Sequence, residues 1–149
     1  MENYIKYEIP SFKIQFEYPE WWDEKIEYDN TYLFWDEFTG SFRITPNKFD
    51  SQNFSIDQFL QNKFNEYIES SPTWRIYNKR KYLYFENISK KDNGLTKLHF
   101  YISGYENILI TCSFAYDKEL LEDENSNDEV AGALEEVDNI LNSLRIEHP

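Results

Sequence analysis

Residues that carry out proton transfer or covalent chemistry are scarce in this chain. Among its 149 residues there are two His and one Cys, against 4 Trp, 12 Tyr and 12 Phe. General bases and nucleophiles in proteins are drawn mostly from His, Cys and paired carboxylates. Aromatic side chains instead supply buried area and rigid contact surface. The composition therefore favours recognition over catalysis.

His99 is the one histidine placed within a regular element. It lies in an apolar strand pattern and should face away from its Leu, Phe and Ile neighbours. A general base there would need a nucleophile and an orienting carboxylate. Thr111 and Ser113 on the following strand could supply the first, and Glu86 the second. No sequence spacing supports such a set, so we expect a solvent-facing or hydrogen-bonded His99, no catalytic residue and no enzymatic activity.

Metal and cofactor sites are also not expected. Aligned as an EF-hand, the acidic loop from Asp123 has Asp128 where glycine is needed and Leu134 where glutamate is needed. None of the four glycines forms a phosphate-binding loop. Cys112 lies in an apolar run, which indicates a buried, inert thiol.

The tyrosines are the better candidates for a binding surface. In the strand 82–88, alternation places Tyr82 and Tyr84 on the same side, and Tyr101 and Trp35 are expected to join them. Tyr and Trp among polar neighbours are typical of a binding face. The alternative is that a helix covers this face and that only the tyrosine hydroxyls reach the rim.

The charge of the chain narrows the class of partner. The net charge is -13, and two segments hold most of the acids: eight between Glu17 and Glu37, and ten between Asp117 and Asp138. Such a field repels nucleic acid and anionic membrane surfaces. We therefore expect a protein partner, basic in character, and neither nucleic acid nor membrane. The alternative is that the acidic segments serve only to keep the protein in solution. The oligomeric state is left open.

The elements that position these residues follow from periodicity and turn signals. Two helices are expected: one is capped by Ser55 with Gln58, has Phe54 as its staple and ends at 70–72, and the other opens at Ser126 with Glu129. A helical turn is expected at 20–24. Strands are expected at 12–18, 32–37, 41–45 (stopped by Pro46), 74–78, 82–88, 96–103 and 107–116. Adjacent hairpins predict one α+β domain, residues 1–149, with an antiparallel sheet of six or seven strands flanked by two main helices.

Three stretches of the chain resemble the PsbP-like superfamily. They are Tyr18-Pro19-Glu-Trp-Trp22, Ser55-Ile-Asp-Gln-Phe59-Leu60 and the closing Val137-Asp-Asn-Ile-Leu-Asn-Ser-Leu-Arg-Ile146. The superfamily includes a photosystem extrinsic subunit, a Ran-binding nuclear import factor and many bacterial domains, and the uncharacterised bacterial branch fits best. The resemblance implies the α+β fold. The family has no common active site, so it assigns no catalytic residue.

Together these observations predict a non-enzymatic cytoplasmic domain that binds a partner protein through an acidic, aromatic-bearing face. A bacterial immunity or inhibitor protein that meets a basic toxin is one concrete form. The alternative is a domain that binds a small apolar ligand in a pocket between sheet and helices. For the core, Phe12, Ile14 and Phe16 are expected to pack against Leu134, Val137 and Leu141.

Overall fold

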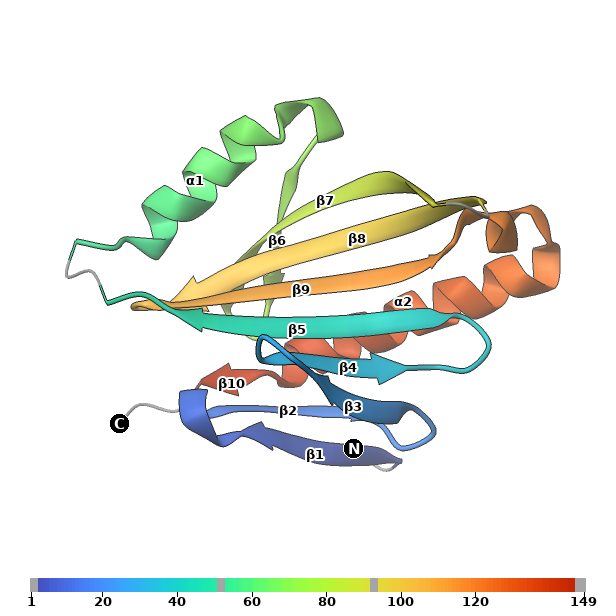
Figure 1. Ribbon diagram of the computed structural model, residues 1–149, viewed down its shortest axis with the longest axis horizontal. Coiled ribbons are helices and arrows are strands. Elements are labelled where there is room, and N and C mark those ends of the chain that lie inside the picture. Colours follow the sequence, from blue (N-terminus) through green and yellow to red (C-terminus); the bar gives the residue numbers. More distant parts are fainter. Residues whose placement is uncertain (1–2, 51–52, 92–93, 147–149) are drawn as a thin grey trace.

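The computed structural model describes residues 3–50, 53–91 and 94–146, and it contains two antiparallel sheets (Figure 1). The large sheet has seven strands in the order β3 (Asp23–Glu27), β4 (Thr31–Trp35), β5 (Gly40–Lys48), β9 (Ile108–Asp117), β8 (Gly94–Tyr105), β7 (Arg80–Lys91) and β6 (Thr73–Tyr77). The small sheet consists of β1 (Tyr4–Ile9), β2 (Ile14–Pro19) and β10 (Arg145–Ile146), with β2 in the middle.

Two helices lie on opposite sides of the large sheet. The helix α1 (Ile56–Glu66) covers one side, and α2 (Glu124–Ser143) with the small sheet covers the other (Figure 1). Short 3-10 turns occupy Pro10–Phe12, Ile68–Ser70 and Lys118–Glu122. We call the sheet side toward α2 the inner face and the side toward α1 the outer face. Neither described helix is long and apolar enough to cross a membrane.

The inner face carries the main core. Alternation in the paired strands directs Phe42, Phe114 and Tyr101 toward α2, whose stripe of Val137, Ile140 and Leu141 is fully buried against them and against β2. The predicted packing of residues 12–16 against α2 is confirmed: Ile14, Phe16, Val137 and Leu141 are buried, and Phe12 and Leu134 are partly buried against them.

The outer face has a smaller core under α1, formed by Leu60, Leu83, Phe85, Ile102 and Leu109. The predicted cap of α1 is confirmed, since the Ser55 side chain accepts a hydrogen bond from the Gln58 N–H at 3.3 Å. The ring of Phe54 lies 5.8 Å from that of Phe59, so it forms the expected staple. The helix itself ends at Glu66 rather than at 70–72.

The predicted α+β fold is confirmed, with four further corrections of detail. Residues 20–24 do not form a helical turn, because β3 begins at Asp23 and pairs along its length with β4. The strand expected at 12–18 starts at Ile14, after the unpredicted β1 and a 3-10 turn. Pro46 does not stop β5, because β4 pairs only as far as Ile44 and leaves a free edge where a missing N–H costs no ladder bond.

The fourth correction concerns the start of α2. Its N-cap is Asp123, whose carboxylate accepts hydrogen bonds from both the N–H and the hydroxyl of Ser126, each at 3.0 Å. The predicted capping residue Ser126 therefore lies inside the helix. Both residues are good caps, and Asp123 brings the stronger, charged acceptor to the positive end of the helix.

Candidate functional site

The three tyrosines predicted to form a binding face lie together, but they are not on the surface. Tyr82, Tyr84 and Tyr101 share the inner face, and they are 0%, 7% and 1% exposed beneath α2. These side chains are therefore covered in this conformation, and the binding role expected of them stays a prediction. The alternative of a helix covering the face holds, because the stripe of α2 needs an apolar surface to pack on.

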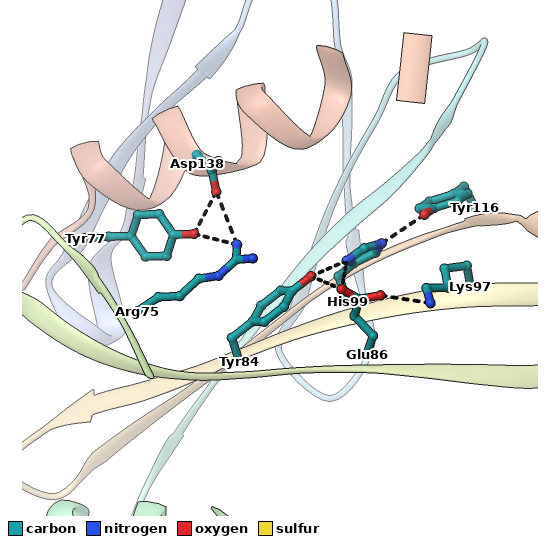
Figure 2. A network of polar contacts seen from close by, with 8 residues as sticks. All are labelled: Arg75, Tyr77, Tyr84, Glu86, Lys97, His99, Tyr116 and Asp138. Atoms are coloured by element: carbon teal, nitrogen blue, oxygen red, sulfur yellow. Dashed lines mark hydrogen bonds and ion pairs between the residues drawn. The ribbon is translucent and has the colours of Figure 1, made fainter. Parts of the chain in front are cut away.

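A chain of polar groups runs through this covered face from its interior to the surface (Figure 2). The hydroxyl of Tyr116 lies 2.9 Å from His99 Nε2, and that of Tyr84 lies 2.7 Å from His99 Nδ1. Tyr84 also donates to Glu86 Oε2 at 2.7 Å, and Lys97 Nζ pairs with Glu86 Oε1 at 2.8 Å. The expected hydrogen-bonded His99 is found, and Glu86 shares its face because the two residues are register partners.

The donors and acceptors of this chain place a proton on Nδ1 of His99. An ionised Glu86 only accepts hydrogen bonds, so the single proton of the Tyr84 hydroxyl goes to Glu86. The Tyr84 oxygen must then accept from Nδ1–H of His99, and Nε2 accepts from the Tyr116 hydroxyl. Every group is satisfied by a neutral imidazole that carries its proton on Nδ1.

The electrostatics agree with this assignment. Burial lowers the pKa of His99 below its ordinary value, although Glu86 opposes the shift. Burial disfavours the charged form of Glu86, but hydrogen bonds from Lys97 and Tyr84 outweigh it and lower its pKa. Burial also raises the pKa of Tyr116 to about 12 and that of Tyr84 above its ordinary value. These tyrosines are neutral donors at physiological pH.

A second set of polar contacts joins β6 to α2 next to the His99 network (Figure 2). Tyr77 donates to Asp138 Oδ1 at 2.7 Å, and Arg75 Nη1 donates to the Tyr77 hydroxyl at 3.1 Å. The Arg75 guanidinium also lies 3.5 Å from the centre of the Tyr84 ring, a cation-π contact. Through Asp138, this second set of contacts fastens α2 to the sheet.

The network offers little scope for catalysis in this conformation. His99 is 5% exposed, so a substrate would reach its imidazole only if the covering elements moved. The nucleophiles considered from the sequence are on the wrong side: Ser113 and Thr111 pair with Phe100 and Ile102, and therefore point to the outer face. Cys112 is fully buried, and burial raises the pKa of its thiol.

Trp35 does not join the tyrosines, because its register partner is Ser41 and both point to the outer face. Its strand β4 lies away from α1 (Figure 1). Its side chain is half-buried and is not part of the core under α1. It lines an open hollow of about 630 Å³ together with Leu33 and Arg43. Arg43 is engaged, since its Nε lies 2.9 Å from the Glu27 carboxylate.

A second hollow, of about 460 Å³, lies on the other side of the β4–β5 turn. We call it the acidic groove; it is lined by Trp21, Trp22, Asp23, Asp36, Glu37, Phe38, Glu129, Gly132, Ala133 and Glu136. Its lining contains five carboxylates and no basic side chain. Asp36 and Glu37 also border the Trp35 hollow, so the two hollows form one continuous surface around the turn.

Two aromatic rings stand out from the acidic groove, and the sequence analysis missed both. Trp21 is 55% exposed and Phe38 is 73% exposed. The neighbouring Trp22 is buried and stacks on Phe114 with 6.3 Å between ring centres, which anchors the segment that presents Trp21. The Trp21-Trp22 pair is the signal that could have found the groove. The two residues lie at a turn, in which the Trp22 N–H bonds to the Pro19 carbonyl at 3.0 Å, and only Trp22 enters the core.

Comparison with solved structures supports a PsbP-like fold. A crystal structure from Bacteroides thetaiotaomicron VPI-5482 matches with a TM-score of 0.74 and 21% identity over 99% of this chain. The match spans only 50% of that protein, so this chain corresponds to about half of its length. The solution structure of cyanobacterial PsbP (CyanoP) from Synechocystis sp. PCC 6803 matches with a TM-score of 0.57 and 11% identity, over 99% of this chain and 94% of that one.

Sequence comparison with curated proteins gives no significant match. A family model, by contrast, aligns with almost the whole chain, from residue 2 to residue 147. The protein therefore belongs to the family described as a domain of unknown function, DUF3805.

Proposed function

We propose that this chain is a non-enzymatic protein-interaction domain that binds a basic partner through the surface around the β4–β5 turn. The observation that carries the proposal is the acidic groove, in which five carboxylates and no cation surround the exposed rings of Trp21 and Phe38. Interfaces are enriched in aromatic anchors. The proposal keeps Trp35 at the edge of the binding surface and assigns the anchoring role to Trp21 and Phe38 in place of the tyrosines.

The placement of the acids supports a basic partner. The groove draws Asp23, Asp36 and Glu37 from one acidic segment of the sequence, and Glu129 and Glu136 from the other. Folding therefore brings the two acidic segments together at one surface. A negative surface of this kind speeds the encounter with a positive one, as in an inhibitor or immunity protein that meets a basic toxin.

Binding of a small apolar ligand between sheet and helices has less support. The space between α2 and the inner face is filled by Tyr82, Tyr101, Ile110 and Val137, each at most 1% exposed. The two hollows around the β4–β5 turn are open and carry charged side chains. Apolar ligands prefer deep, mostly apolar pockets.

The proposal is tested by affinity capture from the native cell with three immobilised forms of the chain. They are the wild type, a Trp21→Ala, Phe38→Ala double variant and an Ile76→Ala control; Ile76 is 73% exposed on β6, the far edge of the sheet. A stoichiometric partner retained by the wild type and the control, and lost from the double variant, is expected. Equal retention by all three, or no stoichiometric partner, would contradict the proposal.

With the captured partner in hand, the electrostatic contribution to binding can be measured. Exposed charges act over about 8 Å at physiological ionic strength, so added salt should chiefly slow association. Truncation of Trp21 should speed dissociation and cost on the order of 2 kcal/mol of binding free energy. A His99→Ala, Cys112→Ser variant that keeps its fold should bind as the wild type does. An association rate that does not change with salt would remove the steering argument.

A further inference from the structure

Gly132 is a glycine in the middle of α2 that has no packing role. Apart from the backbone of its own helix, a Cβ built on it would meet no atom within 4 Å, so no packed neighbour requires the absence of a side chain. Interior helical glycines weaken a helix, and those with a purpose usually allow another group to approach the backbone closely. Gly132 lines the acidic groove. The helix therefore presents bare backbone to the groove, where a group from outside the chain can lie.

The carboxylates of the groove divide into two sets. Asp36 accepts hydrogen bonds from the N–H of Phe38 and the hydroxyl of Thr39, and Glu136 accepts from the Tyr4 hydroxyl. These two are therefore engaged in holding the groove together.

The other three carboxylates, on Asp23, Glu37 and Glu129, have neither a hydrogen-bond partner nor an ion-pair partner among the residues that the structure describes. They come from three separate elements: the start of β3, the β4–β5 turn and the first half of α2. The groove thus offers three free negative charges beside two exposed aromatic rings.

We propose that the acidic groove is a subsite for a lysine or arginine side chain of a basic partner segment. The aliphatic stem lies along the helix surface left bare at Gly132, and the cation meets the free carboxylates and the rings of Trp21 and Phe38. Aromatic rings attract cations within about 6 Å, and carboxylates complete their coordination with charge-assisted hydrogen bonds. The inference rests on the proposed function and deepens it by naming the chemical group that is recognised.

The four tryptophans provide the assay. Their indole N–H signals in a ¹H–¹⁵N spectrum report on the groove (Trp21 and Trp22), on the neighbouring hollow (Trp35) and on the remote β6 (Trp74). The probes are short glycine-flanked arginine and lysine peptides, with the citrulline peptide as a neutral, nearly isosteric control. Saturable shifts of Trp21 with the two cationic peptides, and none with citrulline, are expected. Similar shifts at Trp21 and Trp74 would show non-specific attraction and overturn the inference.

Two variants separate the subsite from the overall charge. A Gly132→Met variant fills the floor of the groove with a residue that favours the helix, and it should weaken peptide binding at least about tenfold while the fold is retained. The second variant removes the three free carboxylates (Asp23→Asn, Glu37→Gln, Glu129→Gln) and changes the net charge from -13 to -10. It should also weaken peptide binding at least about tenfold. Its charge-matched control, Asp50→Asn, Asp57→Asn, Glu69→Gln, neutralises exposed acids around α1 and should bind within about twofold of the wild type.

The outcomes distinguish the subsite from the proposed function. Equal weakening by the two triple variants, or unchanged binding by Gly132→Met, overturns the subsite. If the peptides leave Trp21 unmoved while a native partner is captured in a groove-dependent way, the subsite is wrong and the interaction function stands. Saturable peptide binding without groove-dependent capture would instead support the subsite and contradict the proposed function.

Discussion

Replacing Tyr84 by phenylalanine tests whether the polar chain through His99 is a stabilising device. The change removes one hydroxyl and keeps the ring that stacks against Arg75. It leaves the Nδ1–H of His99 without an acceptor at bonding distance, because the nearest Glu86 oxygen lies 3.9 Å away. Glu86 loses the hydrogen bond from the Tyr84 hydroxyl, but its side chain is 42% exposed, so a water molecule can take the place of that donor.

The size of the effect follows from this asymmetry. A buried donor left unsatisfied costs about 1–3 kcal/mol, and His99 is 5% exposed. We therefore expect Tyr84→Phe to lower the free energy of unfolding by about 1–3 kcal/mol in urea titration. Tyr28→Phe is the control: Tyr28 is 90% exposed, and its substitution should change stability by less than about 0.5 kcal/mol.

NMR spectra of the same two proteins test which nitrogen of the His99 imidazole carries the proton. Long-range ¹H–¹⁵N correlation spectra distinguish the Nδ1–H from the Nε2–H tautomer, and His148 is the only other histidine in the sequence. The wild type should show a neutral Nδ1–H form of His99 at pH 7. An Nε2–H tautomer, or a Tyr84→Phe variant as stable as the wild type, would refute the assignment of donors and acceptors along the chain.

Three further predictions follow from burial and helix chemistry. Leu141→Ala, at a fully buried position of α2, should lower the free energy of unfolding by about 2–5 kcal/mol, and Leu134→Ala, at a half-buried position, should lower it by less. Both losses are measured by urea titration, and a larger loss for Leu134→Ala would show that the buried face of α2 is misassigned. Gly132→Ala should raise stability by about 0.5–1 kcal/mol, measured in the same way, because its Cβ meets open space; a loss would show an unseen neighbour. Burial lowers the pKa of His99 below its ordinary 6.5, so the unfolded chain takes up the proton first and the free energy of unfolding falls as the pH drops below about 6.5. Between pH 7 and pH 5 the wild type should lose more unfolding free energy than His99→Gln, by at most about 1.4 kcal/mol per pH unit. Equal losses in the two proteins would contradict this.

The sequence predicted correctly those elements that are specified by contacts between residues close together in the chain. Ser55 and Phe54 specify the start of α1 through contacts within a few residues, so the sequence is sufficient there. The segment at 20–24 is different. Its backbone becomes extended at Asp23 because β4 offers a pairing edge, and that edge is not visible in the local pattern. The small sheet escaped prediction for the same reason, since β10 joins β2 from the other end of the chain.

The placement of the tyrosines shows what alternation does and does not establish. It correctly put Tyr82 and Tyr84 on one side of β7, and Tyr101 is the register partner of Tyr84. It did not say which side α2 covers, because aromatic residues occupy both sides of these strands. The error for Trp35 is one of register: Phe34 pairs with Phe42 in the core, and this pairing directs Trp35 to the opposite face.

The acidic groove could be predicted from the sequence only in part. Its lining comes from residues 21–23, 36–38 and 129–136, and only the tertiary fold brings these three segments together. The adjacent pair Trp21-Trp22 nevertheless carries local information, because the turn that holds it, closed by the Trp22 N–H and the Pro19 carbonyl, sends one ring into the core and the other outward. Trp22 is 4% exposed and Trp21 is 55% exposed. Trp21 makes an edge contact with the Tyr4 ring, with 6.5 Å between the ring centres, but it stays outside the core beside an acidic edge strand. Its large exposed area is the reason to look for a further partner outside the chain.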